Sequence, residues 1–287
     1  MTTISAELDW RDAIDDAIAV PEKPEWLLKI LDAPRPASTN RRQITALSGG
    51  KDSSAMALAM AYFEPGDQTY VITPTGNEMP AMIAHWLKLG RMLGSPLVPV
   101  SRQSLQGLIR QQRMLPNHRA RWCTRILKLE QYYGWLAKQT PCISYVGLRA
   151  DEESRTGMIF PDADGIVMDF PMQRWGWALH DVTAFLQWIG LNIPDRTDCA
   201  MCFWQKLGEW FLLWRDHLDL WMEAESLELW VQEERGSAVT LRSPSRDTWP
   251  ADLKGLRLRF EAGDIPTRSL AMMDKRRLAG SCRACTL

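Results

Sequence analysis

The chain has 287 residues, a formal net charge of −1, 24% charged residues and 46% hydrophobic residues. This composition is that of an ordinary globular protein, and it excludes a disordered chain or binding through bulk positive charge. No apolar run reaches the roughly 20 residues of a membrane span. Residues 1–20 lack the basic and apolar regions of a signal peptide, so we expect a cytoplasmic protein that does not enter a membrane.

A helical N-terminal segment is predicted over residues 1–40. Residues 7–33 alternate apolar and charged side chains at helical spacing, with breaks at Pro21 and Pro24. A turn-rich linker follows at 33–42 and separates this segment from the next.

Residues 41–170 alternate short apolar strands with helices. Strands are predicted at 43–47, 68–76, 96–101 and 142–147, and helices at 53–63 and 79–93. This alternation indicates an α/β domain with a doubly wound, mainly parallel sheet.

Residues 171–287 are predicted to be helical and are rich in tryptophan. Trp204, Trp210, Trp214, Trp221 and Trp230 recur at spacings that place several of them on one helix face. Core packing or a helical interface is the expected role, and stacking on nucleic-acid bases is the alternative.

The stretch SGGKDS, residues 48–53, lies between the first predicted strand and its helix. Its two glycines permit a tight turn and close approach of a ligand, and the first amides of the helix favour an anion. An Asp beside phosphates indicates that Mg²⁺ is also held there. A capped glycine turn is the alternative to a nucleotide site. The residues expected to contact the nucleotide here are Ser48, Gly49, Gly50, Lys51, Asp52, Ser53 and Ser54.

Four stretches together resemble the PP-loop adenine nucleotide alpha-hydrolase superfamily, in its phosphoadenosine phosphosulfate (PAPS) reductase-like branch. They are SGGKDS (48–53), TPTGNEMP (73–80), CTRILKLE (123–130) and GLRADEESR (147–155), and residues 169–191 continue the similarity. The resemblance implies a doubly wound α/β fold and cleavage of ATP, bound with Mg²⁺, between its alpha and beta phosphates.

The chain also departs from the pattern of that branch. Pro74 stands where the branch usually has Asp. Lys51 is present, and the tail GSCRACTL (280–287) replaces a motif with one nucleophilic Cys. The intact loop favours ATP over PAPS, and the chain looks more like the ATP sulfurylase small subunit or the DNA-phosphorothioation enzymes of the same branch.

The resemblance extends the expected nucleotide site to two further loops. Each follows a predicted strand, at the sheet edge where open α/β sheets place ligands. Glu78 is expected to hold the ribose or Mg²⁺, with helix capping by Asn77 as the alternative. Either Glu152 or Glu153 is expected to take the place of the Glu in the motif of this branch. The expected residues are Thr75, Gly76, Glu78, Gly147, Arg149, Glu152 and Arg155. We assign catalytic roles to Lys51, Asp52, Arg149 and Cys285.

Residues 102–128 carry seven Arg or Lys and no acidic residue. A solvated face and a groove for substrate phosphate or nucleic acid are equal alternatives.

Two C-x-x-C pairs, Cys199/Cys202 and Cys282/Cys285, indicate one thiolate-ligated site for zinc or an iron–sulfur cluster. In the iron–sulfur members of the resembled branch, cysteines near position 123 join a later C-x-x-C. The resemblance therefore implies a [4Fe–4S] cluster, or alternatively Zn²⁺, on Cys123, Cys199, Cys202 and Cys282, with Cys285 left as a working thiol. Cys142 is expected to be a buried core residue.

These features predict an ATP-cleaving, pyrophosphate-releasing enzyme that activates a substrate for sulfur transfer or for modification of a nucleic acid or metabolite. A thiol-dependent PAPS or APS reductase is the second hypothesis. A non-enzymatic, ATP-binding subunit of a sulfur-transfer complex is the third. Partners expected besides the nucleotide are a nucleic acid or a sulfur-donor protein.

Overall fold

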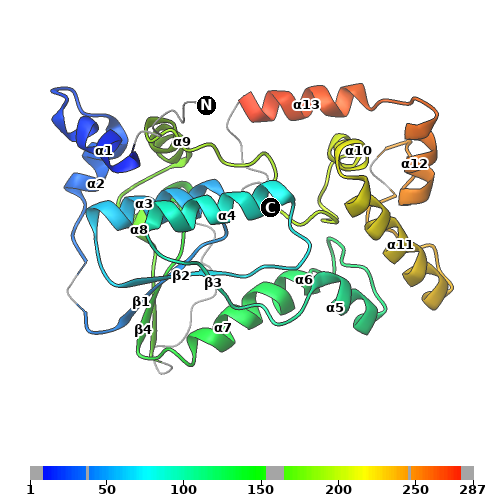
Figure 1. Cartoon of the computed structure of the whole chain (residues 1–287), viewed down its shortest axis with the longest axis horizontal. Helices are drawn as coiled ribbons and strands as arrows, with labels where there is room; N and C mark the ends of the chain where they lie inside the picture. Colours follow the sequence, from blue (N-terminus) through cyan, green and yellow to red (C-terminus); the bar gives the residue numbers. More distant parts are fainter. Residues whose placement is uncertain (1–8, 37–38, 153–164, 245–246, 279–287) are drawn as a thin grey trace, which may run out of the picture. The chain divides into compact units, whose positions relative to one another are not determined.

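The computed structural model describes residues 9–36, 39–152, 165–244 and 247–278. These residues form two compact units, each assembled from separate stretches of the chain (Figure 1). Unit 1 comes from Met1–Ile72, Ala81–Pro99 and Gly134–Pro194, and unit 2 from Thr73–Pro80, Val100–Tyr133 and Asp195–Leu287. No helix among the described residues combines the length and apolar character needed to cross a lipid bilayer.

Unit 1 is built on a parallel sheet with the strand order β3-β2-β1-β4-β5 among the described residues. Its strands are β1 (Arg42–Ala46), β2 (Gln68–Ile72), β3 (Val98–Pro99), β4 (Cys142–Tyr145) and β5 (Ile166–Asp169). Ile44 lies opposite Thr69 on one side and opposite Ser144 on the other. The strand order therefore reverses between β1 and β4, where open α/β sheets form a crevice at the carboxyl ends of the strands. The predicted parallel α/β fold is confirmed.

The helices of unit 1 lie before, between and after these strands in the sequence. They are α1 (Trp10–Ala19), α2 (Glu25–Asp32), α3 (Lys51–Phe63), α4 (Pro80–Leu93), α8 (Pro171–Arg174) and α9 (Leu179–Trp188), with a 3₁₀ turn, η2, at Ala150–Glu152. Helix α3 is buried at every position from Ser53 to Met60 and packs on α8 and α9. Its small Ala residues let it lie close to both neighbours, as expected of a helix that is apolar all round.

Aromatic side chains join α2 to α9. Trp26 lies edge-on to Trp177 at 6.2 Å and to Phe185 at 5.1 Å, measured between ring centroids. All three are at most 1% exposed, and burying each such side chain stabilises the fold by roughly 1.5–3 kcal/mol. This cluster fixes α2 against α9 within unit 1.

Unit 2 is helical. It contains α5 (Leu105–Gln112), α6 (Trp122–Thr124), a π-helical turn η1 (Arg125–Leu129), α10 (Leu207–Asp216), α11 (Leu218–Arg235), α12 (Leu253–Glu261) and α13 (Thr267–Leu278). Helix α7 (Glu130–Leu136) spans the division between the units. Trp210 and Trp221 are fully buried and pack edge-on at 6.0 Å, so these two tryptophans serve the core.

Glu228 on α11 is a buried carboxyl group that organises two loops. It is 1% exposed and accepts hydrogen bonds at 2.7 Å from the Leu241 and Leu253 N–H groups. Burial raises the pKa of Glu228 to about 7, and the two N–H groups oppose this shift only in part.

The raised pKa of Glu228 makes the stability of the protein depend on pH. The folded chain keeps this proton up to about pH 7, whereas the unfolded chain loses it near the ordinary value of 4.5. Its stabilising contribution is therefore complete below pH 4.5 and is lost as pH rises through about 7. We expect Glu228→Gln, which does not titrate, to lack this loss of up to roughly 3 kcal/mol. Urea unfolding of both proteins across this pH range measures it, and a pH-independent difference between them would contradict it.

Candidate functional site

The loop after β1 is closed by its own serine hydroxyls. Ser53 Oγ lies 2.9 Å from Ser48 Oγ, accepts from the Gly49 N–H at 3.1 Å and donates to the Gly50 carbonyl at 3.2 Å. The Gly50 N–H donates to Ser48 Oγ at 3.2 Å. Gly50 is the N-cap of α3, so the first-turn amides and the positive end of the helix dipole lie at this loop. The structure thus places the predicted loop residues in one strand–loop–helix turn.

Gly49 fits this turn because no side chain has room there. Its φ is +81°, and a Cβ atom would lie 2.1 Å from Met82 Cε and 2.5 Å from Trp86 Nε1. The Trp86 indole N–H donates to the Ser48 carbonyl at 3.1 Å. Helix α4 therefore supports the loop from outside.

His85 is a further supporting residue of the loop, and the sequence reasoning missed it. It is 4% exposed, and its Nε2 lies 3.5 Å from Ser54 Oγ. Burial, helped by the charge of Lys88, lowers the pKa of His85 to about 4, although the Gly49 backbone partly opposes this. The imidazole is therefore neutral near pH 7. The signal for it is its place in the buried stripe of α4 between Met82 and Leu89.

The turn after β4 meets the start of α3. A Cβ atom on Gly147 would lie 3.1 Å from both the N and Cα atoms of Ser53. Two residues on, Arg149 is 3% exposed and donates from Nη1 to Asp52 Oδ2 at 3.0 Å. The ends of β1 and β4 are thus joined by an ion pair at the point where the strand order reverses.

Two further carboxylates surround the Arg149 guanidinium. Its Nε donates to Asp151 Oδ1 at 2.8 Å, and its Nη2 lies 3.7 Å from Glu152 Oε1. Burial raises the pKa of Asp52, which the charges of Arg149 and Lys51 oppose. Three carboxylates beside two cations leave no net positive charge for a polyphosphate, so bound Mg²⁺ would complete the charge balance.

In unit 2 the turn after β2 is closed by Glu78. Glu78 Oε1 accepts from the Thr75 N–H at 2.5 Å and from the Thr75 hydroxyl at 2.6 Å. Gly76 has a φ of +73°, which this turn requires. The Glu78 carboxylate therefore holds its own turn.

Asn77 joins this turn to the first cysteine pair. Its carbonyl accepts from the Ala200 N–H at 2.7 Å, and its Oδ1 accepts from the Met201 N–H at 2.9 Å. An isolated antiparallel bridge pairs Glu78 with Cys199. The loop at 75–78 and the C-x-x-C at 199–202 form one structure.

Cys123 lies near this pair. A hydrogen bond with Cys202 and burial raise the pKa of Cys199 well above its ordinary value, while the positive charge of Lys128 opposes the shift. Burial, with a smaller contribution from Cys202, also raises the pKa of Cys123. The structure brings three of the four predicted ligands together, and binding a metal would release protons from them. Cys142 is fully buried in β4, as expected.

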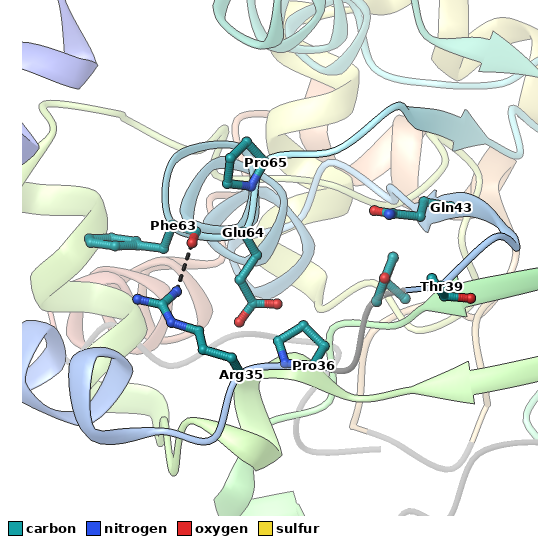
Figure 2. Close-up of a pocket in the computed structure, with 8 residues that line it drawn as sticks. Arg35, Pro36, Thr39, Gln43, Phe63, Glu64 and Pro65 are labelled. Atoms are coloured by element: carbon teal, nitrogen blue, oxygen red, sulfur yellow. Dashed lines mark hydrogen bonds between the residues drawn. The ribbon is translucent and has the colours of Figure 1, made fainter.

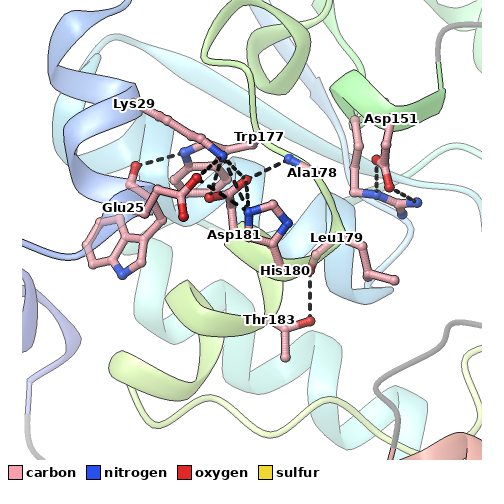
Figure 3. A network of polar contacts seen from close by, with 11 residues as sticks. Glu25, Lys29, Asp151, Trp177, Ala178, Leu179, His180, Asp181 and Thr183 are labelled. Atoms are coloured by element: carbon pink, nitrogen blue, oxygen red, sulfur yellow. Dashed lines mark hydrogen bonds and ion pairs between the residues drawn. The ribbon is translucent and has the colours of Figure 1, made fainter.

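Only one described group of three His, Cys, Asp or Glu side chains has ligand atoms within 4.8 Å of one another, namely Glu25, His180 and Asp181 (Figure 3). A cation already lies in this group, since Lys29 Nζ is 2.8 Å from Glu25 and 2.9 Å from Asp181. The thiols of Cys123, Cys199 and Cys202 do not all lie within this distance of one another, although Cys199 and Cys202 are hydrogen-bonded.

Two cavities lie elsewhere in the units. One of about 310 Å³ in unit 1 is bordered by Thr39 and Gln43, at the amino end of β1, and by Glu64 after α3 (Figure 2). Because the loop at 48–53 leaves the other end of β1, this cavity is separate from that loop. The second, of about 330 Å³, lies in unit 2 and is bordered by Phe203, the residue after Cys202, and by His118.

Several predicted residues lie outside the described part of the chain. They are Glu153, Arg155, Cys282 and Cys285.

Residues 42–167, which run from β1 through the loop and Arg149 into β5, match the family model of the phosphoadenosine phosphosulfate reductase domain. This stretch is a PAPS reductase domain of the adenine nucleotide alpha-hydrolase superfamily. The resemblance expected from the motifs is confirmed. No curated protein matches the chain in sequence.

Two solved structures resemble the chain that carries this PAPS reductase domain. One is PAPS reductase from Candida auris in a phosphate complex, with 12% identity, 65% of this chain and 82% of that chain covered, and a TM-score of 0.43. The other is the U34-tRNA thiolase NcsA from Methanococcus maripaludis with its [4Fe–4S] cluster, with 14% identity, coverages of 81% and 89%, and a TM-score of 0.46.

Gly147 provides a test of the packing between the two loops. We expect Gly147→Ala to destabilise the protein by roughly 1–3 kcal/mol, because the new methyl group would press on the backbone of Ser53. Gly134→Ala is the matched control: this helical glycine has nothing within 4 Å of an added Cβ, so the change should be neutral or stabilising. Denaturant unfolding measures both, and equal effects of the two substitutions would contradict the contact.

Proposed function

We propose that this protein cleaves ATP between its alpha and beta phosphates, releases pyrophosphate and thereby activates an acceptor for sulfur transfer or for another modification. The observation that carries the proposal is the ion pair between Asp52 and Arg149 at the carboxyl ends of β1 and β4. It puts a buried guanidinium, which is suited to bidentate phosphate contact, next to the loop and the first turn of α3.

The residues of this site have separate roles in the proposed reaction. The acceptor attacks the alpha phosphorus, the bond to the bridging oxygen breaks, and pyrophosphate leaves with its charge. Lys51 and the first-turn amides of α3 stabilise that charge, and Arg149 orients the phosphates. A phosphate oxygen would compete with the hydroxyls of Ser48 and Ser53 for the amides of Gly50 and Gly49. Asp52 would help to hold Mg²⁺, which when bound would neutralise phosphate charge.

Product analysis tests this reaction. We expect alpha-labelled ATP to give AMP or an adenylate and gamma-labelled ATP to give pyrophosphate, because the loop is placed to hold two linked phosphates. Lys51→Ala should weaken ATP binding by roughly 1.5–3 kcal/mol, the range for a hydrogen bond to a charged group. Lys138→Ala, at an exposed lysine of unit 1, is the control and should bind normally. Labelled ADP as the product would contradict the proposal.

The cysteines support a [4Fe–4S] cluster as cofactor, held by Cys123, Cys199 and Cys202, with Cys282 as the fourth ligand. Tetrahedral zinc with bonds of about 2.3 Å would need sulfur atoms only about 3.8 Å apart. Cys199 and Cys202 hydrogen-bond to each other, but the three thiols do not all lie within 4.8 Å of one another, and a cluster whose ligands bind different metal ions accommodates that arrangement. When bound, such a cluster supplies a site that carries sulfur or electrons. Cys285 would then remain as the working thiol.

Metal analysis after anaerobic purification tests this site. We expect iron and sulfide in the wild type and their loss in Cys199→Ala and Cys202→Ala, because each removes a thiolate ligand. Cys142→Ala is the control, since that thiol lies in β4 of unit 1, and it should keep the metal. A stoichiometric zinc content without iron would contradict the cluster.

The acceptor that we propose is anionic, with a nucleic acid as the main candidate. The cavity lined by Phe203, the residue after Cys202, also has His118 and Arg235 in its lining, together with Arg242, which is already paired with Asp247. Arg121 lies over the Trp204 ring at 5.9 Å, so a cation and an aromatic face occur together near the cysteine pair.

A thiol-dependent PAPS or APS reductase is the second candidate, which the match to the PAPS reductase domain favours. In that reaction a tail cysteine would attack the sulfate sulfur, and sulfite would be released from PAPS in the presence of a thiol reductant. An ATP-binding subunit without activity would bind ATP but release no pyrophosphate with any acceptor.

A further inference from the structure

Asp151 is a hydrogen-bond partner of the Arg149 guanidinium and lies next to the start of α9. Arg149 Nε donates to Asp151 Oδ1 at 2.8 Å. Burial acts to raise the pKa of Asp151, but Arg149 and the nearby Leu179 backbone lower that pKa below its ordinary value. The Ala150 N–H donates to the Trp177 carbonyl at 2.8 Å, and this bond fixes the segment that carries Arg149 on the residues before α9.

Residues 177–181 are in turn tied to helix α2 (Figure 3). The Trp177 indole N–H donates to the Trp26 carbonyl at 2.9 Å. Lys29 Nζ donates to both carboxylate oxygens of Asp181, at 3.0 and 2.9 Å. Asp181 Oδ2 also accepts from the Ala178 N–H at 2.8 Å and so caps α9.

Asp181 makes this link sensitive to Lys29. Its side chain is 1% exposed, and a buried carboxylate depends on a close cation. His180 lies 3.4 Å from Asp181 but is 63% exposed, whereas the side chain of Lys29 is 27% exposed. Loss of the Lys29 charge would therefore loosen the capped first turn of α9, where the Leu179 N–H meets Asp151.

We propose that Lys29 is a positioning residue for the nucleotide site: through Asp181, the start of α9 and Asp151, it orients the Arg149 guanidinium toward the phosphates. This inference rests on the proposed function, because it assumes that Arg149 binds ATP. Lys29 precedes the matched PAPS reductase domain at 42–167, so the N-terminal helices take part in forming the site.

A double-mutant cycle on the affinity for Mg²⁺-ATP separates this role from a general loss of stability. Lys29→Met should weaken binding roughly 3-fold to 30-fold, the range for residues that act on a site through others. In an Arg149→Lys background the same change should have little further effect, because a lysine has no planar fork to orient. Lys29→Arg should restore binding to within about twofold, since it keeps the charge.

Two further variants control for folding. Glu25→Gln removes the exposed partner of Lys29, leaves the bond to Asp181, and should bind ATP as the wild type does. The pair Lys29→Met/Asp181→Asn removes both charges, so no unpaired buried charge remains, and it should still bind ATP weakly. Binding is measured by calorimetry at a temperature where circular dichroism shows every variant folded.

The outcomes distinguish this inference from the proposed function. A wild type that binds no ATP overturns both. The positioning role alone is overturned if the wild type binds ATP and Lys29→Met weakens binding by the same factor in the wild-type and Arg149→Lys backgrounds. Normal binding by the Lys29→Met/Asp181→Asn variant also overturns it.

Discussion

The buried ion pair between Arg149 and Asp52 is the interaction on which the site depends. Arg149 comes from the turn after β4 and Asp52 from the first turn of α3, so the pair connects the two strands between which the order of the sheet reverses. A guanidinium that is 3% exposed needs carboxylate partners, and their positions determine its orientation. The packing of Gly147 on Ser53 and the closed serine turn follow from this close approach.

The same pair explains why the surroundings of Arg149 are acidic. Asp151 and Glu152 hold the guanidinium in a fixed orientation, which lowers the entropy lost when a phosphate binds. Their charges also repel a bare polyphosphate, so the site is suited to a nucleotide that arrives with Mg²⁺. If the proposed function holds, ATP affinity and dependence on Mg²⁺ would both follow from this arrangement.

Much of this site could be predicted from local sequence, and the rest could not for physical reasons. The conformation of the SGGKDS loop depends mainly on neighbouring residues, because a strand, two glycines and a helix follow one another directly in the sequence. Asp151 acts through its contact with Arg149, which no local pattern reveals, whereas the helical periodicity of α4 indicates that His85 is buried but not that it reaches Ser54. Strand β5 was not predicted, because Ile166–Asp169 is short and shows no clear alternation of apolar and polar side chains. The bond from Ala200 to Asn77 joins residues more than 120 positions apart. Which stretches of the chain form unit 2 therefore depends on long-range contacts that local sequence does not show.

The most direct test of the central claim is a crystal structure with Mg²⁺ and α,β-methylene-ATP, whose carbon bridge prevents the proposed cleavage. Phosphate oxygens should lie within hydrogen-bond distance of both the Arg149 guanidinium and the amides at the start of α3, with Lys51 beside them. An analogue bound elsewhere, or phosphates that contact the loop while Arg149 stays turned away with its carboxylates, would contradict the claim that the ion pair builds the nucleotide site.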